Sequence, residues 1–232
     1  MRFESVRQAA LLLCAFFIAA CSGIPSNEGR LVDPTVKAKT ATAAATPPKS
    51  GPVDVYLIPM DDFPEGALPL IGDRLTKETG LNVRAASPVD ATGLQPYQLQ
   101  QYATDELIAL LGSKTTTLSD TNDKTIFIAY TKRDINDRNG KTRFLFAQAN
   151  GDLRISVISA SRMSGSARWD VPPVFLADRI HKMSKRAIGD LYFKYPRTTN
   201  PKDLMYAPIM SADDIDRIGN EFPSSALKPT SM

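Results

Sequence analysis

Thr125-Ile126-Phe127-Ile128-Ala129-Tyr130 is the stretch of sequence that decides the fold. After its first residue it is apolar throughout, with no alternation between apolar and polar side chains. A run of this kind is typical of a strand in a sheet that is covered on both faces. The stretch therefore predicts a buried strand with helices packed on both sides of its sheet.

The chain before this strand alternates between extended and helical patterns. Residues 53–59 form a β-rich run that ends at a proline, and residues 81–86 resume extended character. Between them, residues 65–79 carry apolar side chains at helical spacing, and Gly80 is placed to end that helix. A second helix is predicted over residues 97–111. Strands and helices in this order indicate parallel βαβ units.

The chain after the strand predicts a hairpin and two further helices. Residues 144–148 and 153–158 read as strands on either side of Asn150-Gly151, a strong hairpin signal. The longest helix is predicted over residues 174–193, and Ser211-Ala212-Asp213-Asp214 begins a short last helix with a capping motif. The fold class expected is therefore α/β (α+β), with a mixed sheet of about five strands and helices packed on it.

The N-terminus has the layout of a bacterial secretion signal. Arg2 and Arg7 precede an apolar run over residues 9–20, which is too short to span a bilayer stably. The sequence Ile18-Ala19-Ala20-Cys21 closes this run and resembles a lipobox, so we expect Cys21 to be lipidated. An ordinary cleaved signal and a buried core helix are the alternatives. Because Ser22 is not acidic, the expected location is the cell envelope, at the outer membrane facing the periplasm in a Gram-negative host.

The remaining chain is expected to divide into three parts. Residues 21–51 are low in complexity and poor in large apolar side chains, which predicts a flexible tether after residues 1–20 are removed. Residues 52–222 are long enough for one globular domain, and residues 223–232 form a polar tail. The formal net charge of +3 gives no general argument for nucleic acid as a partner.

Several motifs of the domain resemble those of archaemetzincin-type zinc peptidases. They are the opening residues 55–64, residues 144–149, residues 157–162 and the sequence Leu204-Met205-Tyr206, which is similar to the methionine turn of that family. The resemblance covers residues 53–222, and it implies a metzincin-like fold with Met205 in the turn. It also implies that the longest helix is the family's active-site helix.

The catalytic residues of that family are missing from the chain. The family motif is HExxHxxGxxH, in which three histidines bind zinc and the glutamate is the base. Alignment on residues 188–189 places Arg186 and Asp190 at the first two ligand positions and Ala187 at the glutamate. Phe193 falls at the glycine and Pro196 at the third histidine. We therefore expect no catalytic residue, no metal site and no cofactor.

The whole chain contains one histidine, His181, and two cysteines, of which Cys14 lies in the predicted signal and Cys21 is the predicted anchor. The mature domain therefore has no thiol for catalysis or metal binding. A serine triad would have to use His181, but no GxSxG elbow accompanies it. A packed imidazole is the expected state of this side chain.

Two interpretations of the basic positions on the longest helix stay open. In the first, Arg186 and Asp190 form an i, i+4 ion pair that fills the space of the absent metal. In the second, Arg179, Lys182, Lys185 and Arg186 are simply a solvated helix face.

Three function hypotheses follow from these features. The first is a non-catalytic, lipid-anchored module that binds a peptide or an envelope protein by edge-strand addition, with Phe144, Leu145 and Phe146 as the edge strand. The second is a zinc-dependent hydrolase with a non-standard site. The third is a structural envelope lipoprotein whose basic helix face contacts anionic headgroups.

Overall fold

The middle strand of the sheet is β4 (Ile126–Thr131), and all six of its residues are buried. On one side it pairs in parallel with β1 (Val55–Pro59), which in turn pairs in parallel with β2 (Val83–Ala85). On the other side it pairs in parallel with β7 (Ile155–Ser159). The edge strand β6 (Ala147–Asn150) runs antiparallel to β7. The predicted mixed sheet of five strands is confirmed.

The computed structural model describes residues 51–97, 100–138, 140, 142–164 and 173–223, all in one unit of the chain. The predicted signal peptide, Cys21, nearly all of the tether and residues 224–232 of the tail lie outside the described residues. Among the helices of the described part, none is long and apolar enough to span a bilayer.

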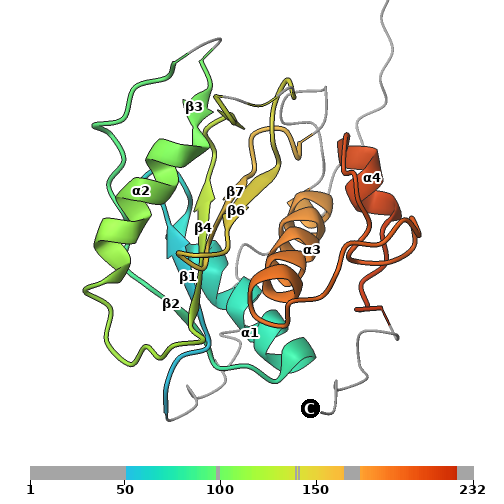
Figure 1. The fold of residues 1–232 in the computed structure, drawn as a ribbon, viewed down its shortest axis with the longest axis horizontal. Coiled ribbons are helices and arrows are strands. Elements are labelled where there is room, and N and C mark those ends of the chain that lie inside the picture. The colour runs from blue at the N-terminus through green and yellow to red at the C-terminus, as the bar shows by residue number, and fades with distance from the viewer. Residues whose placement is uncertain (1–50, 98–99, 139, 141, 165–172, 224–232) are drawn as a thin grey trace, which may run out of the picture. The chain divides into compact units, whose positions relative to one another are not determined.

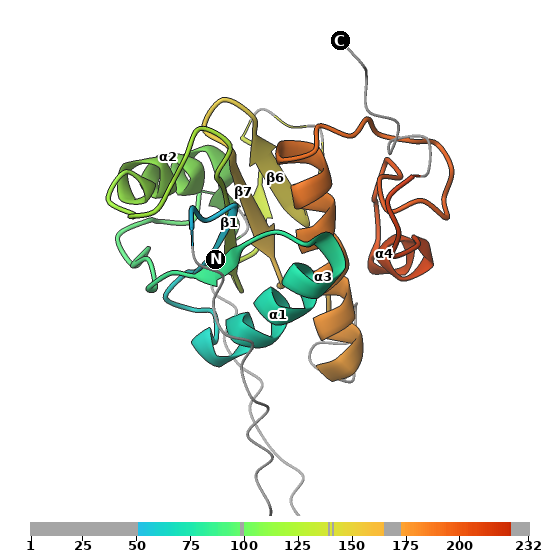
Figure 2. The ribbon, with the colours of Figure 1, turned by 90° about the horizontal axis from the view of Figure 1, so that it is seen from below.

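Helices cover both faces of the sheet, as the apolar run of β4 predicts (Figures 1 and 2). Helix α2 (Thr104–Thr115) packs on one face, where Ile58 and Phe127 belong to its core. Helices α1 (Leu68–Thr79) and α3 (Pro173–Leu191) pack on the other face, against alternate residues of the same strands. The period of two along a strand explains why neighbouring residues serve opposite cores.

Helix α4 (Ala212–Arg217) lies on the far side of α3 from the sheet (Figure 2). It begins as predicted, because the Ser211 hydroxyl accepts a hydrogen bond from the Asp214 backbone N–H at 3.2 Å. The Asp214 carboxylate in return accepts one from the Ser211 N–H at 2.8 Å. Helix α1, which follows a short 3-10 turn, also ends where predicted, with Gly80 at a φ of 76°.

Helix α2 begins at Thr104 and not at residue 97, so the prediction of its N-terminus was wrong. Residues Tyr102–Ala103 instead form strand β3, which pairs in parallel with β5 (Ile135–Asn136). The buried Gln101 side chain holds this segment, since its amide donates to the Arg143 carbonyl oxygen at 2.8 Å. Tertiary pairing therefore overrides the helical pattern of these residues.

The hairpin is confirmed, but its loop differs from the predicted one. Asn150 pairs with Ile155, so four residues connect β6 to β7. The left-handed position of the loop is taken by Arg154, with a φ of 57°, and not by the glycine after Asn150. The Asn150 side chain accepts a hydrogen bond from the Leu153 N–H at 2.9 Å, which closes the loop.

The candidate edge strand Phe144-Leu145-Phe146 does not belong to the regular strand. The edge is β6, which begins one residue later, at Ala147. Leu145 turns toward the small sheet instead, because its N–H donates to the Ile135 carbonyl oxygen at 2.9 Å. Phe144 and Phe146 contact each other edge to face, with ring centroids 5.2 Å apart.

Candidate binding cleft

Helix α3 presents an apolar stripe to the sheet. Its members Ile180, Met183, Ala187 and Leu191 are buried in the core, as their spacing predicts. The side chains between them therefore point away from this stripe.

The basic face of α3 is not solvated, so that interpretation was wrong. All four basic residues are buried. Their exposed fractions are 7% for Arg179, 6% for Lys182, 2% for Lys185 and 7% for Arg186. Helix α4 and the segment around it lie against this side of α3 (Figure 2). Buried cations are stable only when hydrogen bonds and opposite charges compensate for the lost water.

Two of these cations bind α4. The Arg179 guanidinium forms a two-point contact with the Asp216 carboxylate, with its Nε donating to Oδ1 at 2.8 Å. The Lys182 ammonium donates to the carbonyl oxygens of Ile215 and Asp216, each at 3.1 Å. These carbonyls lie in the last turn of the helix, where a cation is favourable.

A third cation, Lys185, binds α1. Its ammonium lies 3.0 Å from the Glu78 carboxylate, which His181 Nε2 also contacts at 3.0 Å. Burial alone would raise the pKa of Glu78, but hydrogen bonds from Lys185, His181 and Arg74 lower it to about 2. Burial lowers the pKa of His181. His181 is thus a packed side chain, as expected, and no catalytic base of the cleft.

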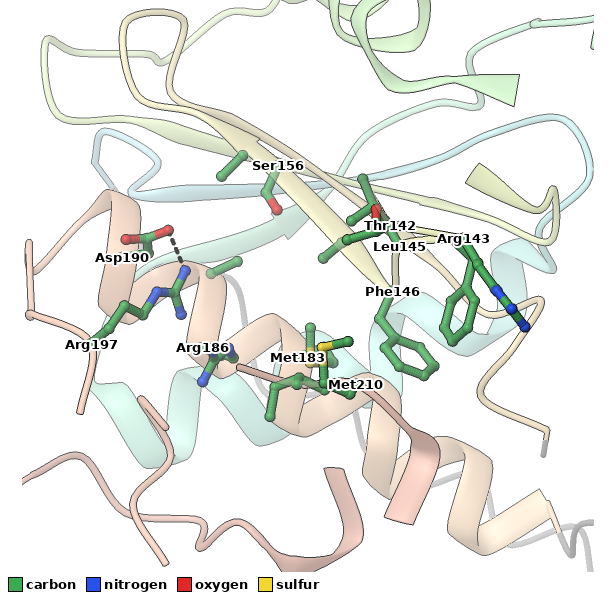
Figure 3. A pocket seen from close by; sticks show the side chains of 15 residues that line it. Thr142, Arg143, Leu145, Phe146, Ser156, Met183, Arg186, Asp190, Arg197 and Met210 are labelled. Atoms are coloured by element: carbon green, nitrogen blue, oxygen red, sulfur yellow. Dashed lines mark hydrogen bonds and ion pairs between the residues drawn. The ribbon is translucent and has the colours of Figure 1, made fainter. Parts of the chain in front are cut away.

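The fourth cation, Arg186, lines a cavity of about 500 Å³ (Figure 3). One wall of this cavity is formed by residues 142–147 and Ala149, which lead into and along β6. A second wall is α3, with Met183, Ala187 and Asp190 beside Arg186. Ser156 of β7 also lines the cavity, and the C-terminal segment adds the side chains of Arg197, Ile209 and Met210. We refer to this cavity as the β6–α3 cleft.

The predicted ion pair between Arg186 and Asp190 is not formed. Arg186 Nη1 donates to the Leu204 carbonyl oxygen at 2.8 Å, which is the only hydrogen bond its side chain makes within the described residues. Asp190 instead accepts from Arg197 Nη2 at 2.7 Å (Figure 3). Burial and the positive charge of Arg197 lower the pKa of Arg186 to about 10, against the opposing effect of Asp190. Arg186 therefore stays charged at neutral pH without an ion-pair partner.

The predicted methionine-turn residue Met205 is fully buried and lies directly against α3. A Cβ atom built on Gly189 would approach the Met205 sulfur to 2.7 Å, so this glycine permits the close contact. Pro196 is exposed and does not line the cleft. Of the five positions aligned with the catalytic motif, the structure thus brings Arg186, Ala187 and Asp190 together at the cleft, whereas Phe193 and Pro196 do not line it.

The residues of the cleft do not fit a zinc ion, the metal that the family resemblance implies. A zinc site needs about three histidine, cysteine or carboxylate ligands, and no such group occurs among the described residues. In the cleft, Asp190 is already paired with Arg197, and a guanidinium has no lone pair available for a metal. We therefore derive no metal-dependent step for this site.

Sequence reasoning missed the residues that complete the cleft from the C-terminal segment. Arg197 lies in the loop that follows α3, and Ile209 and Met210 precede α4. No periodic pattern marks such residues, because their position depends on how the chain returns over the helix. The backbone carbonyl of Leu204, which binds Arg186, carries no sequence signal at all.

Comparisons with known proteins place the fold. No protein-family model matches the chain, and no curated protein matches it. A zinc-dependent peptidase from Methanocorpusculum labreanum is similar in structure, with a TM-score of 0.63, 19% identity, and coverage of 74% of this chain and 97% of that one.

Two archaemetzincins are also similar in structure. The protein from Methanopyrus kandleri has a TM-score of 0.60 at 17% identity, covering 78% of this chain and 94% of its own. The protein from Archaeoglobus fulgidus, solved in complex with malonate, has a TM-score of 0.57 at 17% identity, covering 74% and 96%. The fold of this chain is that of the archaemetzincin-type zinc-dependent peptidases.

Proposed function

We propose that this protein is a non-catalytic peptide-binding module, held at the bacterial envelope through lipidated Cys21, whose β6–α3 cleft accommodates an extended peptide. The observation that carries this proposal is a cleft of about 500 Å³ bordered by a sheet edge and containing an arginine in place of a metal ligand. A cleft of this size is large enough for several side chains of a ligand.

The free edge of β6 supports the proposal. The Ser159 N–H donates to the Phe146 carbonyl oxygen at 2.9 Å, which sets the phase of the antiparallel ladder. By the alternation of such ladders, the backbone groups of Ala147 and Ala149 face away from β7. Within the described residues no strand pairs with this side of β6. An added peptide strand would find those groups available and would lie beside the cleft.

The chemistry of α3 supports the absence of catalysis. Arg186 is buried, charged and bonded to a carbonyl, so it neither binds a metal nor accepts a proton at neutral pH. The likeness to zinc-dependent peptidases favours a second candidate, a hydrolase with a non-standard site. The third hypothesis, contact of a basic α3 face with lipid headgroups, loses its basis because those side chains are buried.

The test is to incubate the full chain, purified in detergent, with a library of extended decapeptides. We expect binding without cleavage, unchanged by a chelator, and no stoichiometric zinc. Peptide cleavage that a chelator abolishes, together with one zinc ion per chain, would establish the hydrolase instead. Absence of any peptide binding would also contradict the proposal.

A proline on the free edge sharpens the test. Ala149→Pro removes an N–H that faces away from β7, so the sheet keeps its own hydrogen bonds. We expect at least a tenfold loss of peptide affinity with an unchanged far-ultraviolet circular dichroism spectrum. Ala149→Ser keeps the N–H with a side chain of similar size and is the matched control. Equal affinity of the proline variant and the wild type would rule out edge-strand addition.

A further inference from the structure

The strongest unused chemical group of the cleft is the guanidinium of Arg186. An arginine side chain has five N–H donors, and Arg186 uses one of its Nη1 donors for the Leu204 carbonyl oxygen. Within the described residues its Nε and Nη2 atoms have no hydrogen-bond partner, yet neither is fully buried, so both keep contact with solvent, and the residue lines the cleft. The edge formed by Nε and Nη2 is therefore free, and this edge matches the two oxygens of a carboxylate.

The charges of the cleft favour an anion at this place. Among the described residues that line the cleft, guanidinium groups come from Arg143, Arg186 and Arg197, and the only carboxylate is that of Asp190. Arg197 already holds this carboxylate at 2.7 Å. Figure 3 shows Arg186 and Arg197 toward one end of the cleft and Arg143 toward the other. The positive charge of Arg186 is thus left without a counterion.

The rest of the lining favours an anion that belongs to a larger, partly apolar ligand. The cleft also has an apolar lining, supplied by Phe144, Phe146, Met183, Ile209 and Met210. An inorganic anion would leave this surface in contact with water, whereas an extended peptide would cover it. The free edge of β6 runs along the same cleft and would hold the backbone of such a peptide.

We propose that the Nε–Nη2 edge of Arg186 binds a carboxylate group of a peptide seated in the β6–α3 cleft, so that a guanidinium anchors the ligand where the fold's peptidases use a metal. This inference rests on the proposed peptide-binding function and names the group that is recognised. A free C-terminus and an acidic side chain present the same carboxylate chemistry, and the experiment separates them.

The experiment measures the affinity of the full chain in detergent for three probes by isothermal titration calorimetry. The probes are an N-acetylated alanine–valine hexapeptide with a free carboxyl terminus, the same peptide as its C-terminal amide, and an amide that contains one glutamate. We expect the free acid to bind about 10- to 100-fold more tightly than the plain amide, the range of a charge-assisted, two-point hydrogen bond. If only the glutamate-containing amide binds this much more tightly than the plain amide, the protein recognises the carboxylate of a side chain.

Variants of the cleft test the assignment to Arg186. Arg186→Met should abolish the difference in affinity between the free acid and the amide. Arg186→Lys keeps the positive charge but loses the paired N–H donors, so it should retain only a part of that difference. Asp190→Asn removes the negative charge that would repel a bound carboxylate, so the free acid should bind about three- to tenfold more tightly. Lys114→Met removes a positive charge from the exposed surface of α2, on the opposite face of the sheet, and as the matched control it should leave the difference unchanged.

The outcomes separate this inference from the proposed function. Equal binding of all three peptides, unaffected by Arg186→Met, would overturn the carboxylate site and leave peptide binding intact. Failure of every peptide to bind would contradict the proposed function itself. Competition by inorganic phosphate at the concentration at which the free acid binds would overturn a peptide carboxylate in favour of a small-anion site. Because Asp190→Asn predicts a gain, misfolding of the arginine variants cannot mimic the whole pattern.

Discussion

Gly189 shows how a single residue sets the contact between α3 and the C-terminal segment. A methyl group at this position would lie 2.7 Å from the Met205 sulfur and 2.9 Å from a ring carbon of Phe222. Gly189→Ala should therefore lower the free energy of unfolding by about 1–3 kcal/mol, the usual effect of overpacking. Urea denaturation followed by circular dichroism measures this change.

The matched control for that prediction is a glycine in another helix. At Gly112, in α2, a methyl group would meet its nearest neighbour, a Leu153 methyl carbon, at an ordinary 3.7 Å. Gly112→Ala should leave stability unchanged or raise it by up to about 1 kcal/mol, since alanine is the better helix former. A stable Gly189→Ala protein would show that the segment moves freely against α3.

Glu78 makes stability depend on pH, again through one side chain. Its pKa of about 2 in the folded protein lies below the ordinary value of 4.5, so its stabilising effect is complete above pH 4.5 and is lost as pH falls toward 2. Because the side chain keeps 27% of its exposure, solvent screens the ion pairs, and we expect a loss of about 1–2 kcal/mol. The lowered pKa of His181 acts in the same direction at somewhat higher pH.

The variant Glu78→Gln tests this dependence. It should destabilise the protein by about 1–3 kcal/mol at pH 7, because the buried Lys185 loses its nearest counterion, and flatten the change between pH 4.5 and 2. Chemical denaturation at a series of pH values gives both quantities. Glu65→Gln, an exposed residue, should behave as wild type. If the free energy of unfolding of Glu78→Gln changed with pH as it does in the wild type, another group would be responsible for the pH dependence.

At the scale of elements, α4 is held to α3 by charge as well as by apolar contact. Asp216→Asn weakens the two-point contact with Arg179, so α4 should open locally more often. We expect amide hydrogen exchange in residues 212–217 to accelerate about 5- to 50-fold, measured by mass spectrometry. Asp213→Asn removes a charge from the same helix that acts on Arg179 only at longer range, without a hydrogen bond, and should accelerate exchange much less. Equal rates in both variants would mean that apolar packing alone holds α4.

The elements also show which features the sequence can predict. The periodic patterns placed β4 and α1 well, and the capping residues of α4 were recognisable because they act within one turn. The start of α2 was missed, since a buried amide, Gln101, and pairing with β5 decide it from a distance. The environment of α3 was missed for the same reason. Four cations at helical spacing read as a solvated face, and only the return of the chain over that face buries them.

The sequence predicted where the candidate site lies but not the hydrogen-bond partners of its residues. The alignment brought Arg186 and Asp190 to one region of α3, and both line the cleft. Their partners, however, are a backbone oxygen of Leu204 and the side chain of Arg197, which lie beyond the helix. Pairing at i, i+4 competes weakly with such tertiary partners, because it contributes only a few tenths of a kcal/mol.

At the scale of the whole molecule, the proposed anchor at Cys21 decides where the protein is found. Cys21→Ala should move it from the membrane fraction to the soluble fraction and abolish labelling by radioactive palmitate, since several acyl chains are needed for a durable anchor. Cys14→Ala, inside the predicted signal, is the matched control and should change neither. Palmitate labelling of the Cys21→Ala protein would contradict lipidation at this residue.

The order of strands in the sheet has a consequence for the export that Cys21 predicts. The first strand, β1, lies between β2 and β4, and its residue Val55 pairs with Ile126, far along the chain. If the chain is exported N-terminus first, as we propose, β1 would emerge early and would have to wait for this distant partner, and closing such a long loop is slow. The sheet could then form only after more than half of the polypeptide had crossed.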